Sequence, residues 1–575
     1  MEKRLLIAIV LSVAVIILWY TLFPPPKPRQ AKRVPPQQAE KEVPPQEEMF
    51  PLEESEKGVV SKPPSYSFAK PEYTSLPPEK EIVVETDLYT ATFSSRGARL
   101  KGLKLLHYKN KIVLPKVCLV FPFSLLYGQK QSHHDSGLKE LVSAQGSDSY
   151  PLQTTFEGPD LEYFAEAPFT THTGFLKLDN SNPQGEITLS WLSKQGVTLI
   201  KKFTFFKGSY YIDYDFTIVN HSPKSLEGSS VVEWTSAVKQ EGKKKGGLFG
   251  GLGGDLSQFL FLKSDEVKKE EDDDIKEKDV FSGEIKWAGF EDKYFISSLI
   301  LNNPQDLTLK LYRSNNSVIG LKVASPLISI PPHTQQTFSY TLYLGPKDMG
   351  HLEKGKGELG RVLSFGFWDP IAKPMLFILK LFYRLIPNYG IAIIFLSVGI
   401  KIIFWPLTHK GQKSMKEMQK EMQKLQPKIA ELKEKYKNNK DELNRRTMEL
   451  YRTHKVNPLG GCLPLLVQFP VFIALYRVLL NSIELRHAPF ISFWINDLSA
   501  KDPTYISPLL MGASMFVQQK MTPTAGDPAQ AKMMLYTMPI VFTFLFLNFP
   551  SGLVIYWLVS NILAIGHQYY INKHS

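Results

Sequence analysis

Apolar runs long enough to cross a bilayer occur only at the start of the chain and after Tyr389, and this distribution constrains the fold most. The first run, Leu5–Phe23, has 19 residues, close to the ~20 that span a hydrocarbon core. The chain between the two apolar regions has the composition of a soluble protein. We therefore expect a mixed membrane protein with six transmembrane helices: the first run and five later spans, at 389–407, 459–480, 505–519, 533–549 and 552–570.

The N-terminal run ends in Trp19 and Tyr20 shortly before a Pro triplet that starts at Pro24. Aromatic residues at the end of a span suit the membrane interface, so an uncleaved anchor is expected over 1–23. The alternative is a cleaved signal peptide, which would have a shorter apolar core and small residues at its cleavage site. Residues 24–78 are rich in Pro, Glu, Lys and Gln and cannot bury a core, which predicts a disordered tether.

Short alternating segments fill the region 79–350. In one of them Ile212, Tyr214, Phe216 and Ile218 share one parity, and polar residues dominate the other. A period of two marks half-buried strands. Many strands without long intervening helices predict an all-β domain of the sandwich type.

Two patterns in this region resemble ligand sites but lack the residues that such sites need. The glycine-rich stretch 242–254 is not followed by the Gly-Lys-Ser/Thr of a phosphate-binding loop. His133-His134-Asp135 has no further ligand at a metal-binding spacing. The two cysteines, Cys118 and Cys462, do not form a disulfide scaffold. We expect no metal, no cofactor and no catalytic residue.

The segment 360–387 is expected to contain an amphipathic helix that lies in the membrane interface. From Asp369 onward, Lys373, Lys380 and Arg384 alternate with Leu and Phe residues. An interfacial helix has this pattern of charged and apolar faces. The same charges disfavour a spanning helix.

The segment 408–457 predicts a basic helical hairpin of the coiled-coil type. Its apolar seam has alternating spacings of three and four and consists of Met415, Met418, Met422, Leu425, Ile429, Leu432 and Tyr436. Lys and Arg are about twice as frequent there as Asp and Glu, which places the hairpin, and with it both chain termini, in the cytoplasm. The hairpin could be a docking arm or simply a solvated charged surface. The net charge of +12 has no accompanying RNA-recognition signature, so nucleic-acid binding is not expected.

Lys401 interrupts an otherwise apolar span. A charge at the bilayer centre costs ~2.5–3.5 kcal/mol on insertion scales, so this side chain should face protein or water. No Asp or Glu occurs in the six expected spans, and a salt bridge between spans is therefore excluded. Ser397 lies one turn earlier on the same face. The alternative to a functional cation is a lysine that snorkels to the headgroups.

The region from Tyr389 to Tyr570 resembles the YidC family of membrane insertases. The matching words are WPLT at Trp405–Thr408, LQPKI at Leu425–Ile429, KVNPLGGCLPLLVQFPVFIALY at Lys455–Tyr476, ELRHAPF at Glu484–Phe490 and FPSGLVIYWLVSN at Phe549–Asn561. The anchor, the tether and the β domain resemble the Gram-negative form, whose periplasmic domain is a β-supersandwich. The resemblance implies an insertase core over 388–575 and no enzymatic activity.

The resemblance also implies a hydrophilic groove that draws polar segments of a substrate into the inner membrane. Lys401 stands where the family usually has Arg, and Ser397, Gln519, Tyr556 and Trp557 stand at groove positions. The partners implied are nascent membrane proteins, the Sec translocon, and the ribosome with signal-recognition components. A coupled transporter would need intramembrane carboxylates, and a sugar-modifying enzyme would need paired carboxylates or a histidine in a cleft.

Overall fold

The structure is a computed structural model that describes residues 77–110, 137–143, 151–158, 164–237, 258–270, 279–303, 306–314, 318–437, 439–454, 463–521 and 528–574. The chain divides between residues 65 and 66 into two units, and all described residues belong to the second. The expected anchor at 1–23, nearly all of the tether at 24–78, both cysteines, His133-His134-Asp135 and the glycine-rich stretch lie outside the described residues.

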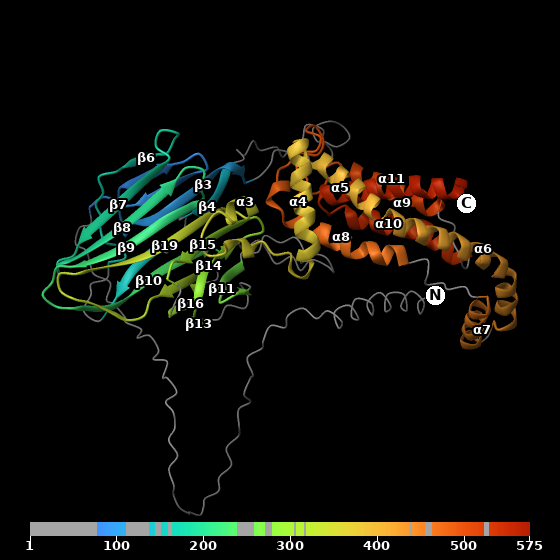
Figure 1. The fold of residues 1–575 in the computed structure, drawn as a ribbon, viewed down its shortest axis with the longest axis horizontal. Coiled ribbons are helices and arrows are strands. Elements are labelled where there is room, and N and C mark those ends of the chain that lie inside the picture. Colours follow the sequence, from blue (N-terminus) through green and yellow to red (C-terminus); the bar gives the residue numbers. More distant parts are fainter. Residues whose placement is uncertain are drawn as a thin grey trace, which may run out of the picture. The chain divides into compact units, whose positions relative to one another are not determined.

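Strands occupy the region that the alternating pattern predicts (Figure 1). The first ten are β1 (Glu81–Glu85), β2 (Tyr89–Ser94), β3 (Arg99–Lys109), β4 (Leu138–Ser143), β5 (Gln153–Glu157), β6 (Phe175–Lys177), β7 (Gln184–Leu192), β8 (Val197–Phe206), β9 (Tyr211–Asn220) and β10 (Leu226–Ala237). The others are β11 (Gln258–Lys263), β12 (Glu266–Glu270), β13 (Asp279–Gly283), β14 (Ile285–Glu291), β15 (Phe295–Leu301), β16 (Leu307–Ser314), β17 (Val318–Ala324), β18 (Ile328–Ile330) and β19 (Gln335–Pro346).

These strands form three sheets, which together make up the β domain. The largest has the order β12-β11-β14-β15-β19-β9-β8-β7, the second β13-β16-β17-β10-β18 with β5 beside β10, and the third β4-β3-β2-β1-β6. In β9 the side chains of Ile212, Tyr214, Phe216 and Ile218 are fully buried while Asp213, Asp215 and Thr217 on the opposite face are half-exposed, as the alternation predicts; Tyr211, at the start of the strand, is buried as well. The core is therefore built from inward-facing side chains of all three sheets.

The last strand, β19, departs from simple alternation. From Tyr340 onward its side chains are buried on both faces. The reason is a connector of short helices, α3 (Met349–Leu352), η4 (Leu359–Val362) and η5 (Gly366–Trp368), part of which packs back on the sheet. The Tyr211 hydroxyl donates a hydrogen bond of 2.8 Å to the Leu352 carbonyl. The chain thus leaves the β domain through a segment that is packed against it.

The amphipathic helix expected within 360–387 is α4 (Asp369–Leu385). Its buried face consists of Ala372, Met375, Leu376 and Leu379. Phe377, Leu381 and Leu385 are exposed on the other side. Large apolar side chains on the exposed face of a helix that also carries charges are typical of a helix lying in a membrane interface.

The C-terminal region is helical and contains α5 (Tyr389–Ile403), α6 (Trp405–Lys435), α7 (Lys440–Thr453), α8 (Leu463–Asn481), α9 (Ile506–Met521), α10 (Pro528–Phe546) and α11 (Ser551–His574). Taken singly, none of the described helices is both long and apolar enough to cross a membrane, whereas α5 and α6, joined at a 61° bend, meet these criteria together. The bend shortens the expected span 389–407, because a new helix begins at Trp405, with Pro406 in its first turn.

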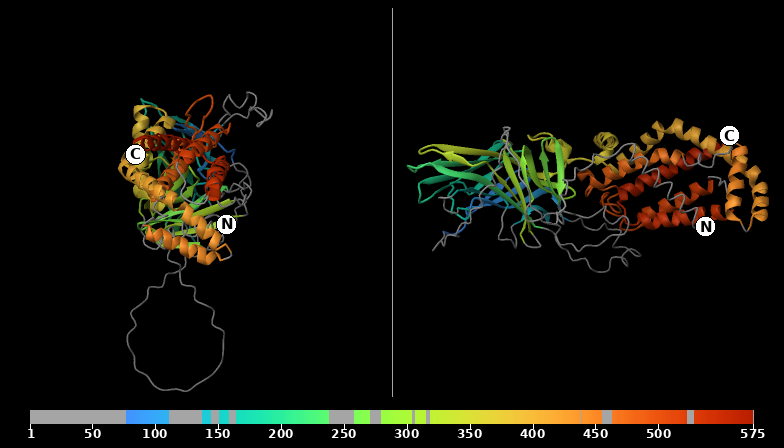
Figure 2. Two further views of the ribbon diagram at one scale, coloured as in Figure 1. Left: turned by 90° about the vertical axis from the view of Figure 1, so that its right-hand side faces the viewer. Right: turned by 90° about the horizontal axis from the view of Figure 1, so that it is seen from below.

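Helices α6 and α7 form the hairpin predicted at 408–457 (Figure 2). Met422 and Leu425 are buried, and Met418, Ile429, Leu450 and Tyr451 pack against them. Leu432 and Tyr436, farther along the expected seam, are half-exposed. The side chain of Met415 lies outside the described part of the chain. The hairpin core is therefore small and confined to the middle of the seam.

Candidate functional site

The helix α5 carries the two residues that define the candidate site, Ser397 and Lys401. Its N-terminus is capped by the Asn388 side chain, which accepts a hydrogen bond of 3.2 Å from the Ile391 amide. Ser397 is fully buried and donates to the Ile393 carbonyl at 2.7 Å. That bond occupies the hydroxyl within its own helix. Lys401, one turn later, has a polar head that its own helix does not satisfy.

The Lys401 amine forms no ion pair or hydrogen bond with any residue that the structure describes. It is half-buried, near the end of α5. The helices α5, α8, α9, α10 and α11 contain no Asp or Glu, so the surrounding helices cannot supply a carboxylate. A cation in such a place requires water or a visiting group as its partner.

A cluster of Trp405, His409 and His567 lies beside Lys401, and the sequence analysis missed it. The rings of Trp405 and His567 stack at 4.1 Å between centroids. His409 Nδ1 and His567 Nε2 are 3.2 Å apart, so one ring donates a hydrogen bond to the other. Lys401 is close enough for an electrostatic interaction with His567. The available signal was a histidine near the end of an apolar helix and another directly after WPLT.

The predicted groove residues Tyr556 and Trp557 lie on different sides of α11. Gly552 lies against both the loop before α9 and α5, since a side chain there would meet the Leu498 carbonyl at 3.2 Å and Ile393 at 3.3 Å. Tyr556, one turn later, is buried on that same side. Trp557 points instead toward an aromatic cluster on α8 and α10, in which it contacts Phe472 at 4.8 Å, Phe546 at 5.3 Å and Phe542 at 6.0 Å between ring centroids. Only Tyr556 therefore faces the helix that carries Lys401.

Gln519 lies near the end of α9, which packs against α11. Its side-chain oxygen is buried and has no hydrogen-bond partner among the described residues. Earlier on α9, Ser514 accepts a hydrogen bond of 3.0 Å from Asn561 of α11. At Gly512 a side chain would lie 1.9 Å from the Thr543 hydroxyl, so α9 and α10 can approach closely only with glycine there. The predicted residues thus occupy neighbouring helices without one shared contact.

The loop between α8 and α9 closes one end of these helices with buried hydrogen bonds. Asp502 is almost completely buried and accepts bonds from Trp494 Nε1 at 3.1 Å, Thr504 Oγ1 at 2.8 Å and the Ser507 amide at 2.7 Å. The Ser551 amide, at the start of α11, donates to the Ala500 carbonyl at 2.7 Å. This end of the helical region is therefore sealed by ordered structure, and it is the end opposite Lys401, which lies at the C-terminal end of α5.

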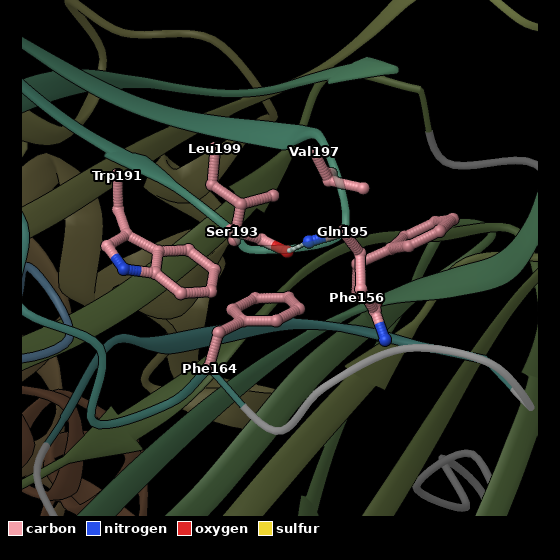
Figure 3. A pocket seen from close by; sticks show the side chains of 7 residues that line it. All are labelled: Phe156, Phe164, Trp191, Ser193, Gln195, Val197 and Leu199. Atoms are coloured by element: carbon pink, nitrogen blue, oxygen red, sulfur yellow. Dashed lines mark hydrogen bonds between the residues drawn. The ribbon is translucent and has the colours of Figure 1, made fainter. Parts of the chain in front are cut away.

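The β domain contains a pocket that is an alternative candidate site (Figure 3). It is lined by Phe156, Phe164, Trp191, Ser193, Gln195, Val197 and Leu199. The Gln195 backbone amide donates a hydrogen bond of 2.9 Å to Ser193 Oγ. None of the lining residues is an acid or a base, so the pocket has no group for acid–base catalysis. Within the described chain no cluster of three or more His, Cys, Asp or Glu residues could hold a metal ion.

Two family models match the chain. The model described as "YidC periplasmic domain" matches residues 81–378, and "60Kd inner membrane protein" matches 381–575. The membrane protein insertase YidC of Syntrophus aciditrophicus is 39% identical over 588 residues, which cover 100% of both chains. The protein of the same name from Citrifermentans bemidjiense is 40% identical over 575 residues, covering 100% of this chain and 99% of the relative.

A solved structure of an active YidC insertase with its first transmembrane domain resolved aligns with 86% of this chain at 19% identity. The alignment covers 93% of that structure, with a TM-score of 0.35. Family models match both regions, and relatives of about 40% identity match the full length. Both findings agree with the sequence motifs that resemble this family. The chain therefore belongs to the YidC family, multi-pass proteins of the bacterial inner membrane that have a periplasmic domain and are not enzymes.

Proposed function

We propose that this chain is a membrane protein insertase that draws polar segments of nascent membrane proteins into the bilayer toward Lys401. The observation that carries this proposal is the Lys401 amine, which has no partner among the described residues and lies within helices that contain no carboxylate. The relatives of similar length are named membrane protein insertases. Nascent membrane proteins are the substrates that this activity implies.

The attraction is physically sufficient for the role. Two unit charges 4 Å apart interact with about 4 kcal/mol at an effective dielectric constant of about 20. When an acidic or polar segment of a substrate approaches Lys401, this attraction therefore compensates part of the hydration energy that the segment loses. The loop around Asp502 blocks passage through the opposite end, so the segment enters from the side of Lys401. In this mechanism the substrate helix then moves laterally into lipid.

The proposed groove uses Ser397, Gln519 and Tyr556 in different ways. Ser397 is satisfied within α5 and sets the packing of the helix that carries the cation. Gln519 offers a buried oxygen that a substrate donor or a water molecule can satisfy. Tyr556 bounds the groove on the side of α11, and Trp557 supports it from behind through the aromatic cluster.

The proposed topology has six spans with both termini in the cytoplasm. The anchor at 1–23 and the tether at 24–78 lead to the β domain in the periplasm, and α4 lies in the outer interface. The hairpin of α6 and α7 then lies in the cytoplasm, as its excess of Lys and Arg favours. Its basic exterior, together with the C-terminus, is a docking surface for ribosomes and signal-recognition components, and the Sec translocon is a further partner.

The experiment that tests the function is co-translational insertion of a small membrane protein into vesicles that contain the full-length chain. We expect Lys401→Ala to reduce the initial rate about tenfold and Lys401→Glu to reduce it further, because a carboxylate repels an acidic segment. Lys401→Arg should retain most of the activity. The control is Lys310→Glu, which changes an exposed lysine of β16, away from the hairpin, and should have little effect.

A photo-crosslinking residue identifies the surface that the substrate contacts. Val398 is half-buried and lies three residues before Lys401 on the same helix face. Ile403 is 70% exposed and points to another side. Stalled nascent chains should crosslink more strongly from position 398 than from 403. Normal insertion in all Lys401 variants would show that this lysine has no role in the transfer.

A further inference from the structure

Three charged side chains from distant parts of the sequence meet next to α4. Lys380 Nζ of α4 lies 2.9 Å from Asp348 Oδ2 and 2.5 Å from Glu484 Oε1. Asp348 follows the last strand of the β domain and caps α3 by accepting the His351 amide. Glu484 belongs to η7 (Ile483–Leu485), directly after α8. One lysine therefore joins the β domain, the interfacial helix and the loop that seals the helical region.

The cluster is shielded from water. The Glu484 side chain is only 8% exposed, and those of Lys380 and Asp348 are 26% and 21% exposed. Tyr108, Tyr210 and Tyr343 of the β domain lie close enough for electrostatic interactions with these groups. Burial raises the pKa of the Glu484 carboxyl even though Lys380 opposes the shift. Burial opposes ionisation of Asp348 as well, but the hydrogen bond and the charge of Lys380, together with Glu484 and His351, outweigh burial and lower the pKa of Asp348. An ion pair in such surroundings is costly to break from one side.

The helix that Lys380 holds is packed directly against the helix that carries Lys401. Phe382 of α4 contacts Phe395 of α5 at 5.7 Å between ring centroids. At the turn between these helices Tyr383 and Tyr389 stack at 3.9 Å. The start of α5 is fixed to the sealing loop as well, because Asn388 Nδ2 donates to the Phe490 carbonyl at 2.9 Å. A shift of α4 or of this loop would therefore move α5.

The sealing loop holds the β domain at a second point through Arg486. Its Nη2 donates to the Lys109 carbonyl at 2.7 Å, at the end of β3. Its guanidinium also lies over the Phe295 ring at 5.3 Å from the centroid. These contacts of Arg486 join the β domain to the loop, whereas those of Lys380 include α4 as well. Lys380 is therefore the residue of the two that ties all three parts together.

We propose that Lys380 is a positioning residue of the insertase, which holds α5 and its Lys401 in place by tying α4 to both Asp348 and Glu484. This inference rests on the proposed function of Lys401. It gives the β domain a role in insertion that requires no ligand of its own: the end of its last strand presents Asp348 as a fixed point for the interfacial helix. Lys373 offers a matched contrast, since it pairs with Asp369 one turn earlier on the same helix.

The test measures insertion of a small membrane protein by vesicles that contain full-length variants at equal protein content. Lys380→Met should lower the initial rate roughly fivefold to tenfold, since one-sided removal of a shielded ion pair is costly. Lys380→Arg should restore most of the rate, whereas the charge exchange Lys380→Glu with Glu484→Lys should not, because it places a carboxylate of α4 next to Asp348. Lys373→Met should match the unaltered protein. Resistance to protease confirms that each variant is folded.

Positioning is separated from simple destabilisation by combining variants. If Lys380 only stabilised the fold, Lys401→Ala would reduce the rate by the same factor in the Lys380→Met background as in the unaltered protein. If Lys380 positions Lys401, that factor should fall from about ten to below three in the Lys380→Met background, because the cation is already misplaced. Equal factors, or a normal rate for Lys380→Met, would overturn the inference while leaving Lys401 as the working cation. A normal rate for Lys401→Ala alone would overturn the proposed function, and the inference with it.

Discussion

Lys201 of the β domain and Lys401 of the helical region both lie in poorly hydrated places without a neighbouring carboxylate, but they differ in the partners of their amines. Lys201 is 1% exposed, and its amine donates a hydrogen bond of 2.7 Å to the Gly97 carbonyl. It also lies 5.2 Å from the centroid of the Phe169 ring and 5.9 Å from that of Phe216. Lys401 has no such arrangement among the described residues.

The difference separates a lysine that serves packing from one that is available to another molecule. The carbonyl of Gly97 and the two aromatic faces satisfy Lys201 inside the domain. Burial, with a contribution from Arg99, lowers the pKa of Lys201 to about 7. Removing this charged amine from water therefore reduces the free energy of unfolding. At Lys401 the described helices provide neither a counter-charge nor an acceptor. The proposed function assigns the interaction energy of Lys401 to a substrate.

The largest expected effect is the pH dependence of stability that comes from Lys201. Because the pKa of Lys201 is lower in the folded chain than in the unfolded one, the unfolded chain binds more protons between pH 7 and about 10.5. Stability should therefore rise with pH in that window, by up to about 1.4 kcal/mol per pH unit from this group. Lys201→Met should remove the slope. Hydrogen exchange of β8 and β9 in the full-length protein, followed as a function of pH, measures this slope.

The control for this experiment is the neighbouring residue. Lys202 points to the opposite face of β8 and pairs with Glu186 at the surface. Lys202→Met should therefore leave the slope intact. Insertion by Lys201→Met should match the unaltered chain at neutral pH, and a loss there comparable with that of Lys401→Ala would break the distinction between the two lysines.

The second prediction concerns the hairpin, whose small core contrasts with the large core of the β domain. Leu425→Ala removes one of the two enclosed side chains of its described core, at a cost of about 2–3 kcal/mol to the local helix pairing. Hydrogen exchange in α6 and α7 should accelerate strongly, while β9 and β19 should not change. Met448, which is 50% exposed on α7, is the control position for substitution by alanine. Faster exchange throughout the chain would contradict the independence of the hairpin.

The sequence predicted the β domain better than the candidate site, for physical reasons. Alternation along β9 is a local pattern, and the burial of Ile212 and Phe216 follows from it. The composition of α5 likewise identified Lys401. The cluster of Asp348, Lys380 and Glu484 joins residues 32 to 136 positions apart, and no local periodicity encodes such a contact. Trp557 was assigned to the groove by resemblance, and only helix packing shows that it faces α8 and α10.

A third prediction concerns a variant in which Lys401, like Lys201, has a partner within the protein. Ser397→Asp places a carboxylate one turn before Lys401 on α5. The internal pair should compete with the substrate and reduce the insertion rate about tenfold, which corresponds to about 1.4 kcal/mol. Ser397→Asn is the control of equal size without charge. If both variants insert equally well, the charge of Lys401 is not what the substrate uses.

The smallest expected effect tests whether polar contacts between the helices hold the site together. Asn561 of α11 donates to Ser514 of α9 at 3.0 Å. Hydrogen bonds between membrane helices average only about 0.6 kcal/mol in double-mutant cycles, because the separated helices find other partners. A cycle of Asn561→Leu and Ser514→Ala, measured by unfolding in detergent, should therefore give a coupling of that size and change insertion less than twofold.

The matched cycle lies in the β domain, where Tyr214 donates to Thr154 at 2.7 Å and both side chains are fully buried. There the corresponding coupling should be larger, since a buried polar group left unpaired costs about 1–3 kcal/mol. A larger coupling at Asn561 than at Tyr214 would mean that the helical region, and not the β domain, depends on exact polar pairing, which would reverse the comparison drawn from the two lysines.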